Sequence, residues 1–245
     1  GDIQGDVFLQ AIVLCGGKGT RLRPYTHSLP KPMLPLGRKP ILEYTVEHLR
    51  KHGFTELVFT VGHLRQEIMN YFGNGKKFGV SIEYAEEESE LGTAGSVANS
   101  RKFIHSSDFL VLMGDQLTNL DYSKFVDFHK KHGSIASIAL KKMGVPMQYG
   151  TVEIDAHKQV TCFTEKPILE QLINAGMYAF SSKIFDYLPA KGDFALNVFP
   201  DLMKKNQKIF GYVFEDYWVD VGSLHQYESI NQTISLMDLI AGSGK

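Results

Sequence analysis

Four positively charged residues gather around a glycine-rich segment near the beginning of the chain. Gly16, Gly17 and Gly19 come directly after an apolar run, Phe8–Leu14, that is typical of a buried parallel strand. Because glycines leave no side chain at the end of this strand, backbone N–H groups can approach a phosphate chain closely. The four cations are Lys18, Arg21, Arg23 and Lys31. Together these features predict a site that holds a polyphosphate for chemistry rather than only for binding.

Two common glycine signatures do not match this segment. The phosphate loop of nucleoside triphosphatases has the pattern G-x-x-x-x-G-K-[ST], which residues 16–22 do not contain. The dinucleotide fingerprint G-x-G-x-x-G can begin at Gly17, but Leu22 stands where its third glycine belongs. Lys18 and Arg23 either contact phosphate or lie on the outer side of the loop. A glycine-rich turn with incidental charges is the plain alternative.

The composition restricts the class of protein. The chain has 245 residues and a formal net charge of -1, which argues against a general nucleic-acid binder. No apolar stretch reaches the roughly 18–20 residues of a membrane span, and Gly1–Gln10 lacks the pattern of a signal peptide. Cys15 and Cys162 have no metal-ligand spacing, and Cys15 is expected as a small buried apolar residue. We therefore expect a cytoplasmic protein with no nucleic-acid and no membrane partner.

Short β-rich runs alternate with helix-like stretches in the first half of the chain. The runs expected as strands are Phe8–Leu14, Leu57–Val61, Val80–Tyr84, Phe109–Met113 and Ile135–Leu140. The stretches expected as helices are Ile41–His52, Leu64–Phe72 and a third around Phe125 and Phe128. This βαβαβ order predicts an α/β fold with a mostly parallel sheet covered by helices on both sides.

The second half has a more mixed pattern. A hairpin is expected from Thr151–Ile154 and Val160–Phe163, followed by a strand at Met177–Phe180. A short helix is expected at Lys183–Leu188 and a longer one at Leu224–Leu239. No linker rich in proline, glycine or serine separates the halves. We therefore expect one domain over residues 7–240, with two lobes at about 7–120 and about 121–240.

The segments GGKGTRLRP and SLPKPMLPLGRKPILEY, in this order, resemble the opening of the sugar-1-phosphate nucleotidylyltransferases. The resemblance implies a Rossmann-like fold, with a mixed, mostly parallel sheet flanked by helices and a smaller sugar-binding lobe. It also implies an enzyme that joins a nucleoside triphosphate to a sugar 1-phosphate and releases pyrophosphate. Arg21 and Lys31 would neutralise charge, because an anionic phosphate must attack the α-phosphorus. The residues expected to contact the nucleotide here are Leu14, Gly16, Gly17, Gly19 and Thr20.

A second glycine motif, LGTAG at residues 91–95, follows the expected strand at 80–84. In similar enzymes this motif lies against the base and ribose, so the resemblance places Gly92 and Thr93 at the nucleotide. The acidic run just upstream, residues 86–90, includes Glu87. A carboxylate there could accept hydrogen bonds from the N1–H and the N2 amine of guanine, which uracil and thymine cannot imitate. A solvated acidic loop is the plainer explanation of the run, and both stay open.

Asp115 stands at the carboxyl end of an expected buried strand, where open α/β sheets place their sites. The resemblance gives it the role of a Mg²⁺ ligand. Its partner would be Asp220, because WVDVG at residues 218–222 is similar to the family's W-x-D-[IV]-G segment. Two carboxylates, completed by phosphate oxygens and water, match what Mg²⁺ requires. A cap of a helix or turn is the alternative for Asp115.

Three further motifs follow in the order of the family, namely Y-G at 149–150, E-K-P at 165–167 and N-x-G-x-Y at 174–178. The resemblance implies that Lys166 meets the sugar phosphate and acts as a third catalytic cation, which a mobile ammonium can do. The residues that it places at the sugar are Gly150, Glu165, Asn174 and Gly176. The alternative for Glu165 and Lys166 is a surface ion pair before a proline.

The residues of these motifs are most similar to those of the mannose-1-phosphate guanylyltransferase-like branch of the family. GTP and a mannose-1-phosphate-like sugar are therefore the first choice, followed by UTP or dTTP with glucose 1-phosphate. The expected mechanism is direct in-line attack without a covalent intermediate. A cytidylyltransferase and a regulatory module without turnover are the rivals. The first would not be expected to contain the EKP and WVDVG segments, and intact Asp115 and Lys31 argue against the second.

The resemblance extends from Phe8 to about Ile230. The partners that it implies are a nucleoside triphosphate and a sugar 1-phosphate, and a homodimer is possible. No C-terminal β-helix domain is expected, because only Ile240–Lys245 follows the last helix. Gly1–Asp6 precedes the start that the resemblance implies, as a remnant of cloning or as a linker from a larger protein.

Overall fold

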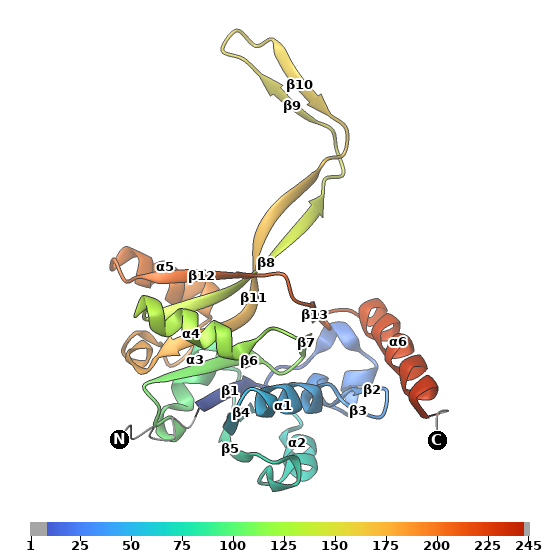
Figure 1. Ribbon diagram of the computed structural model, residues 1–245, viewed down its shortest axis with the longest axis vertical. Helices are drawn as coiled ribbons and strands as arrows, with labels where there is room; N and C mark the ends of the chain where they lie inside the picture. The colour runs from blue at the N-terminus through green and yellow to red at the C-terminus, as the bar shows by residue number, and fades with distance from the viewer. Residues whose placement is uncertain (1–8, 243–245) are drawn as a thin grey trace, which may run out of the picture.

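A seven-stranded sheet forms the centre of the molecule, in the order β12-β8-β11-β6-β1-β4-β5 (Figure 1). The computed structural model describes residues 9–242, with side chains through residue 234, so Phe8 and Gly1–Asp6 lie outside the described residues. The strands of this sheet are β1 (Leu9–Leu14), β4 (Phe54–Val61), β5 (Ser81–Glu86), β6 (Asp108–Met113), β8 (Ala136–Pro146), β11 (Ile168–Ser181) and β12 (Ile209–Phe214).

The strand directions confirm a mixed, mostly parallel sheet. β1 runs parallel to β4 and β6, and β4 runs parallel to β5. β11 is antiparallel to both of its neighbours, β6 and β8, while β12 is parallel to β8. The strands of the second half of the chain therefore extend the sheet that the first half begins. As a result, the carboxyl ends of β1 and β6 lie side by side, which brings the glycine loop next to Asp115.

Helices cover both faces of the sheet because its central strands are apolar on both sides. Along β1, Ala11 and Val13 belong to one core cluster, whereas Ile12 and Leu14 belong to another on the opposite face. The first cluster includes α1, α2 and α4, and the second includes α3 and α5. The helices are α1 (Ile41–Lys51), α2 (Arg65–Phe72), α3 (Gly92–Asn99), α4 (Tyr122–His132), α5 (Phe199–Lys204) and α6 (Leu224–Gly242). No helix within residues 9–242 combines the length and apolar character that a bilayer crossing requires.

Two small sheets hold the segments around the carboxyl end of β6. β7 (Gln116–Thr118) pairs with β13 (Trp218–Asp220), and β2 (Pro35–Leu36) pairs with β3 (Lys39–Pro40). A third apolar cluster, which includes Leu22, Leu34 and Tyr227, packs these segments against α6. The register of β7 and β13 sets Asp220 opposite Gln116, so that Asp220 is placed beside Asp115.

A long two-stranded extension projects from the sheet (Figure 1). β8 and β11 continue as a pair beyond the buried part of the sheet, and the hairpin of β9 (Thr151–Ile154) and β10 (Val160–Thr164) forms its far end. We call residues 142–173 the arm. Nearly all of the arm is exposed, whereas β8 and β11 become buried where they join the body of the sheet.

The structure differs from the sequence expectations mainly in the second half. The strand expected at Met177–Phe180 starts nine residues earlier, at Ile168, because β11 stays paired with β8 along the arm. The helix expected at Lys183–Leu188 is a 3-10 helix over Ser182–Tyr187. The hairpin expected at 151–163 is present, and it forms the far end of the arm.

Candidate active site

The glycine loop after β1 is anchored at both of its ends. The Cys15 N–H donates to the carbonyl of Thr60 at 3.1 Å, and the Thr26 hydroxyl donates to the carbonyl of Gly19 at 2.8 Å. Gly19 has a φ of 56°, and a Cβ there would lie 2.9 Å from Thr26 Cγ2 and 3.2 Å from Lys31 Cβ. A larger residue at position 19 would therefore push Lys31 away from the loop. Burial, followed by the Asp115 and Glu87 carboxylates, raises the pKa of the Cys15 thiol, which agrees with its expected role as a buried residue.

A cavity of about 230 Å³ lies over this loop. It is lined by Leu14, Gly16, Gly17, Gly19, Thr20, Arg21, Leu22, Lys31, Pro32, Met113, Asp115 and Gly222. The structure thus brings together the residues of the opening loop that were expected at the triphosphate, both expected cations of this segment and one expected metal ligand. Arg21 and Lys31 are the only cations in this lining.

Lys31 joins the two aspartates that sequence analysis paired. Its Nζ lies 2.6 Å from Asp115 Oδ2 and 3.5 Å from Asp220 Oδ1. The side chain of Lys31 is 11% exposed, that of Asp115 is 20% exposed and that of Asp220 is 42% exposed. The Val221 N–H donates to the carbonyl of Asp115 at 3.3 Å, which fixes the two acidic segments to each other. One ammonium and two carboxylates leave a net negative charge at the rim of the cavity.

This pair of carboxylates has the composition of a divalent-cation site that is shared with a substrate. Among the described residues, no group of three or more histidine, cysteine, aspartate and glutamate side chains gathers to form a metal site. A hard cation such as Mg²⁺ usually takes one or two carboxylates and completes its octahedron with phosphate oxygens and water. Asp115 and Asp220 beside an open cavity therefore fit such an ion.

A second cavity, of about 520 Å³, adjoins the glycine loop. Its lining residues are Gly17, Lys18, Gly62, His63, Arg65, Glu87, Glu88, Ser89, Glu90 and Lys191. Arg65 forms ion pairs with Glu86 and Glu88, each at 3.1 Å, and Lys18 lies 3.5 Å from Glu90. The exposed members of the acidic run are therefore paired at the surface, as the solvated-loop alternative predicts.

Glu87 differs from its acidic neighbours because it points inward. It is 8% exposed, and its Oε1 accepts no hydrogen bond from the described residues. Burial raises the pKa of the Glu87 carboxyl, and a hydrogen bond from Ser96 partly opposes this effect. A Cβ on Gly16 would lie 3.6 Å from Glu87 Oε2, so the carboxylate is immediately beside the glycine loop. A buried acceptor without a partner is costly and is typical of a site that awaits a donor.

The LGTAG motif begins α3, and its threonine has partners within the chain. The Thr93 N–H and hydroxyl both donate to Asp193 Oδ1, at 3.0 and 3.3 Å, and the Phe194 N–H donates to the Thr93 hydroxyl at 3.0 Å. Neither Gly92 nor Thr93 lines the two cavities described above. Their contact with a nucleotide stays a prediction. Thr93 also links the start of α3 to Asp193 and Phe194, a structural role that sequence reasoning missed.

Two of the expected sugar contacts lie near Asp115. Asn174 Nδ2 donates to the Tyr178 hydroxyl at 3.0 Å, and its Oδ1 accepts from the Gly176 N–H at 2.9 Å. A Cβ on Gly176 would lie 2.8 Å from Gln116 Nε2, directly after Asp115 in the chain. Gln116 is buried and its Oε1 accepts no hydrogen bond from the described residues. Sequence reasoning missed Gln116, although its position next to Asp115 was a usable signal.

The other expected sugar contacts lie on the arm. A Cβ on Gly150 would lie 2.7 Å from Glu165 Oε2, so the Y-G and E-K-P motifs do meet. Gly150, Glu165 and Lys166 nevertheless line neither cavity, because the arm projects away from the body (Figure 1). β8 and β11 stay paired along the arm, which holds these three residues away from both cavities. Their contact with the sugar and its phosphate stays a prediction.

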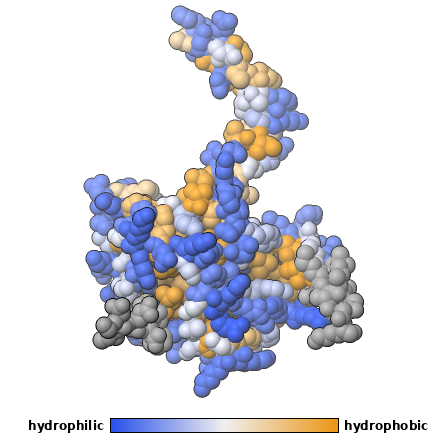
Figure 2. Space-filling view, in the orientation of Figure 1, coloured by the Kyte–Doolittle hydropathy of each residue, from blue (hydrophilic) through white to orange (hydrophobic). Residues whose placement is uncertain are grey.

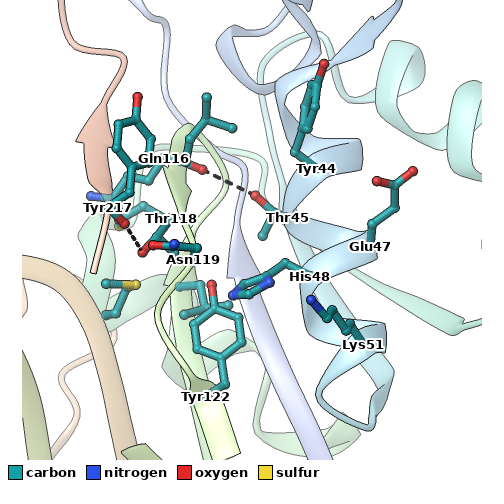
Figure 3. Close-up of a pocket in the computed structure, with 14 residues that line it drawn as sticks. Tyr44, Thr45, Glu47, His48, Lys51, Gln116, Thr118, Asn119, Tyr122 and Tyr217 are labelled. Carbon is teal, nitrogen blue, oxygen red and sulfur yellow. Dashed lines mark hydrogen bonds between the residues drawn. The ribbon is translucent and has the colours of Figure 1, made fainter. Parts of the chain in front are cut away.

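A third cavity, of about 470 Å³, lies between α1 and β7 (Figure 3). Within it, the Thr45 hydroxyl donates to the carbonyl of Gln116 at 3.4 Å, and the Thr118 hydroxyl donates to the carbonyl of Tyr217 at 2.7 Å. None of the residues expected at nucleotide, sugar or metal lines this cavity. The glycine loop with the two aspartates is therefore the candidate active site.

A comparison with protein families shows which family the chain belongs to. Residues 10–235 match the model of a family described as nucleotidyl transferase. The chain belongs to this family. The relatives described next are named as sugar-1-phosphate nucleotidyltransferases. These names confirm the family and the class of enzyme that the glycine loop and the later motifs predict.

Three curated relatives are each 36% identical to the chain. They are a UTP–glucose-1-phosphate uridylyltransferase of Synechocystis sp., a mannose-1-phosphate guanylyltransferase of Mycobacterium tuberculosis and a D-glycero-α-D-manno-heptose 1-phosphate guanylyltransferase of Campylobacter jejuni. The matches cover 89%, 88% and 89% of this nucleotidyl transferase chain, respectively. The chain spans 61% of the length of the first two relatives and 97% of the third.

A solved structure shares the fold. HddC from Yersinia pseudotuberculosis is 28% identical, with a TM-score of 0.74, and the match covers 92% of this chain and 99% of that chain. A second structure of HddC is a complex with GMP-PN. The chain therefore shares its mixed sheet and flanking helices with HddC.

Proposed function

We propose that the chain transfers a guanylyl group from GTP to a sugar 1-phosphate of the mannose type and releases pyrophosphate. The observation that carries the choice of GTP is the buried, unpartnered Glu87 Oε1 beside the glycine loop. Guanine offers N1–H and an N2 amine on one edge, and a carboxylate can accept both. Two curated relatives that are named guanylyltransferases, and a related structure with bound GMP-PN, support the same choice.

The residues of the cavity then have separate tasks. The glycine loop holds the triphosphate through backbone N–H groups, and Arg21 offsets its charge. Asp115 and Asp220 would hold a Mg²⁺ ion, which supplies further neutralisation of the phosphates. Lys31 stands next to both aspartates and can turn its ammonium towards a phosphate oxygen. The sugar phosphate attacks the α-phosphorus in line while pyrophosphate leaves on the opposite side, so positioning and charge neutralisation provide the catalysis.

A second candidate is a uridylyltransferase that acts on glucose 1-phosphate. The relative from Synechocystis sp. with that name matches the chain as closely in identity as the guanylyltransferases do. The two candidates share every step except recognition of the base and the sugar. They differ in what Glu87 contacts, because uracil does not have the pair of donors that guanine presents.

A panel of triphosphates tests the choice. The purified chain with Mg²⁺ is heated in the presence of GTP, UTP, dTTP, CTP or ATP, and the midpoint of unfolding is measured. GTP is expected to give the largest increase, because a ligand that binds only the folded state stabilises it. Pyrophosphate release is then measured with mannose 1-phosphate and with glucose 1-phosphate, and without sugar phosphate as the control. An equal response to all five triphosphates would overturn the proposal of GTP.

A further inference from the structure

One lysine at the cavity of about 520 Å³ has no carboxylate partner. Three residues with a permanently charged cationic side chain line this cavity, and they are Lys18, Arg65 and Lys191. Lys18 and Arg65 are each paired with glutamates of the acidic run, at distances of 3.1 to 3.5 Å. Lys191 is exposed and forms no ion pair with any residue that the structure describes. Its ammonium is therefore available to an anion that enters the cavity.

The backbone around Lys191 packs directly against the two glycines of the LGTAG motif. A Cβ on Gly92 would lie 2.5 Å from the carbonyl oxygen of Gly192, and a Cβ on Gly95 would lie 3.1 Å from Lys191 Cα. Any side chain at either glycine would therefore force this backbone away from α3. We call residues 190–193 the clamp segment. In this structure, the small residues of the motif make room for the chain's own clamp segment.

Hydrogen bonds hold the clamp segment at the beginning of α3. The Gly192 N–H donates to the carbonyl of Leu91 at 2.8 Å, and the Gly192 carbonyl accepts from the Ala94 N–H at 2.9 Å. Asp193 Oδ1 accepts from both the N–H and the hydroxyl of Thr93. The residue before α3 provides no side-chain cap, so the Asp193 carboxylate satisfies one of the N–H groups that the first turn leaves without a helical partner. The position of the clamp segment is therefore fixed relative to α3.

The surroundings of Lys191 favour a phosphate group as its ligand. Gly17 and Lys18 line the same cavity, and Gly17 also lines the cavity over the glycine loop, so the two cavities share a border at this loop. Backbone N–H groups of a glycine loop suit phosphate oxygens, and a mobile ammonium adds a point charge that can follow them. This inference rests on the proposed function, because that function brings two phosphate-bearing substrates, a triphosphate and a sugar 1-phosphate, to the loop.

We propose that Lys191 binds a phosphate group of a substrate at the border of the two cavities, and that Asp193 positions Lys191 by holding the clamp segment against α3. Lys191 contacts the substrate, whereas Asp193 acts through Lys191. The triphosphate and the sugar 1-phosphate carry the same chemical group, so the experiments below distinguish these two sources. The LGTAG motif then contributes to substrate binding indirectly, because its glycines admit the backbone that carries the cation.

Lys191→Ala tests the phosphate contact. Calorimetry measures the Kd of GTP with Mg²⁺, and pyrophosphate release gives the KM of mannose 1-phosphate. The Kd is expected to rise about tenfold if the phosphate belongs to the nucleotide, and the KM by the same factor if it belongs to the sugar phosphate. Lys191→Arg keeps the charge and should restore most of the affinity.

Lys183→Ala is the matched control for this experiment. Lys183 is an exposed lysine that lines neither cavity and forms no ion pair with the described part of the chain. Its replacement should change neither constant. If Lys191→Ala also leaves both the Kd of GTP and the KM of mannose 1-phosphate unchanged, the proposed contact is overturned.

Asp193→Ala tests the positioning of Lys191. The variant is expected to weaken the same constant by about fivefold, because the clamp segment loses its hydrogen bonds to Thr93. In a chain that already carries Lys191→Ala, the same substitution should have little further effect. Asp193→Asn keeps an oxygen that can accept from Thr93 and should bind like the wild-type chain. Fully additive effects of Asp193→Ala and Lys191→Ala would show that Asp193 does not act through Lys191.

Chemical labelling separates a failure of this inference from a failure of the proposed function. Acetic anhydride modifies exposed lysines, and mass spectrometry compares Lys191 with Lys183 in the same wild-type chain. Inorganic pyrophosphate, GTP and mannose 1-phosphate are tested separately for protection of Lys191, with Lys183 expected to stay unchanged. If the chain releases no pyrophosphate with any triphosphate while inorganic pyrophosphate still protects Lys191, the proposed function fails alone. If none of the three compounds protects Lys191, the inference is overturned.

Discussion

The ammonium of Lys31 lies 2.6 Å from Asp115 Oδ2, so a residue expected at a phosphate and a residue expected at a metal form one unit. Asp220 Oδ1 lies 3.5 Å from the same ammonium. In this arrangement Lys31 occupies the space between the two carboxylates and offsets half of their charge. A divalent cation and the Lys31 ammonium therefore compete for the same oxygens, and phosphate oxygens offer Lys31 another partner.

Lys31→Gln tests this competition. The variant is expected to lose about 100-fold in the rate of pyrophosphate release, because charge that develops on the phosphates is no longer offset. In the absence of nucleotide, however, it should bind Mn²⁺ about tenfold more tightly than the wild-type chain, since two carboxylates are left without their ammonium. Calorimetry measures the second effect. Lys39→Gln, which removes an ammonium that pairs with Glu47 at the surface, is the control and should change neither quantity.

Replacement of the aspartates tests the metal site. Asp115→Asn and Asp220→Asn are each expected to lower pyrophosphate release by about 100-fold or more, and to raise the Mg²⁺ concentration that half-saturates the reaction. Asp115 is less exposed and closer to Lys31, so its replacement should have the larger effect. Asp186→Asn, at an exposed ion pair with Arg101, is the control. Near-normal rates in both variants would mean that these residues do not hold the metal.

The parts of the site that depend on local pattern could be predicted from the sequence. The glycine loop and Asp115 each follow a short apolar run, and parallel strands bring such ends together. Asp220 was identified because the WVDVG segment around it resembles a family motif. The pairing of β13 with β7 confirms that it lies beside Asp115. The inward orientation of Glu87 within an acidic run could not be derived from composition, because its neighbours differ from it only in exposure.

The arm and the contacts of Thr93 could not be predicted for a different reason. The exposed parts of β8 and β11 mix polar and apolar residues (Figure 2) without a regular period, so the pattern does not reveal that these strands leave the body. Thr93 meets Asp193, which is 100 positions away in the chain, and neither residue has a neighbour that signals the pairing. Both features depend on tertiary packing rather than on local periodicity.

Glu87→Gln tests recognition of the base. The variant is expected to bind GTP at least about tenfold more weakly, because an amide oxygen cannot match a carboxylate that accepts two hydrogen bonds. Binding of UTP should change little. In the wild-type chain GTP affinity should fall as the pH falls through the raised pKa of Glu87, where the acceptor becomes protonated. Calorimetric titration of Glu88→Gln, whose carboxylate pairs with Arg65 at the surface, provides the control.

The same substitution should stabilise the chain without ligand. Because burial raises the pKa of Glu87, the folded chain binds its proton more tightly than the unfolded chain does. The contribution of Glu87 to the free energy of unfolding therefore falls as the pH rises from the pKa of Glu87 in the unfolded chain through its raised pKa in the folded chain. Glu87→Gln should be more stable than the wild-type chain at neutral pH, and the difference should become smaller near pH 4, as measured by urea unfolding. A constant difference across this range would contradict the assignment.

His129 should make the chain less stable as the pH falls, which is opposite to the effect of Glu87. It is buried beside Ser137, whose hydroxyl lies 2.9 Å from its Nδ1, and its Nε2 is 3.4 Å from Asp108 Oδ1. Burial lowers the pKa of the imidazole, and the Asp108 carboxylate opposes this more weakly. The unfolded chain therefore binds the proton more tightly, so stability is lost as the pH falls below about 6.5.

His129→Asn is expected to be less stable by about 1–2 kcal/mol at pH 8, because the buried hydroxyls lose a partner, and to lose this part of the pH dependence. Urea unfolding between pH 5 and pH 8 measures both effects for the wild-type chain and the variant. His105→Asn, at an exposed position, should follow the wild-type curve. If the two variants had the same dependence on pH, the buried imidazole would not be the group that titrates.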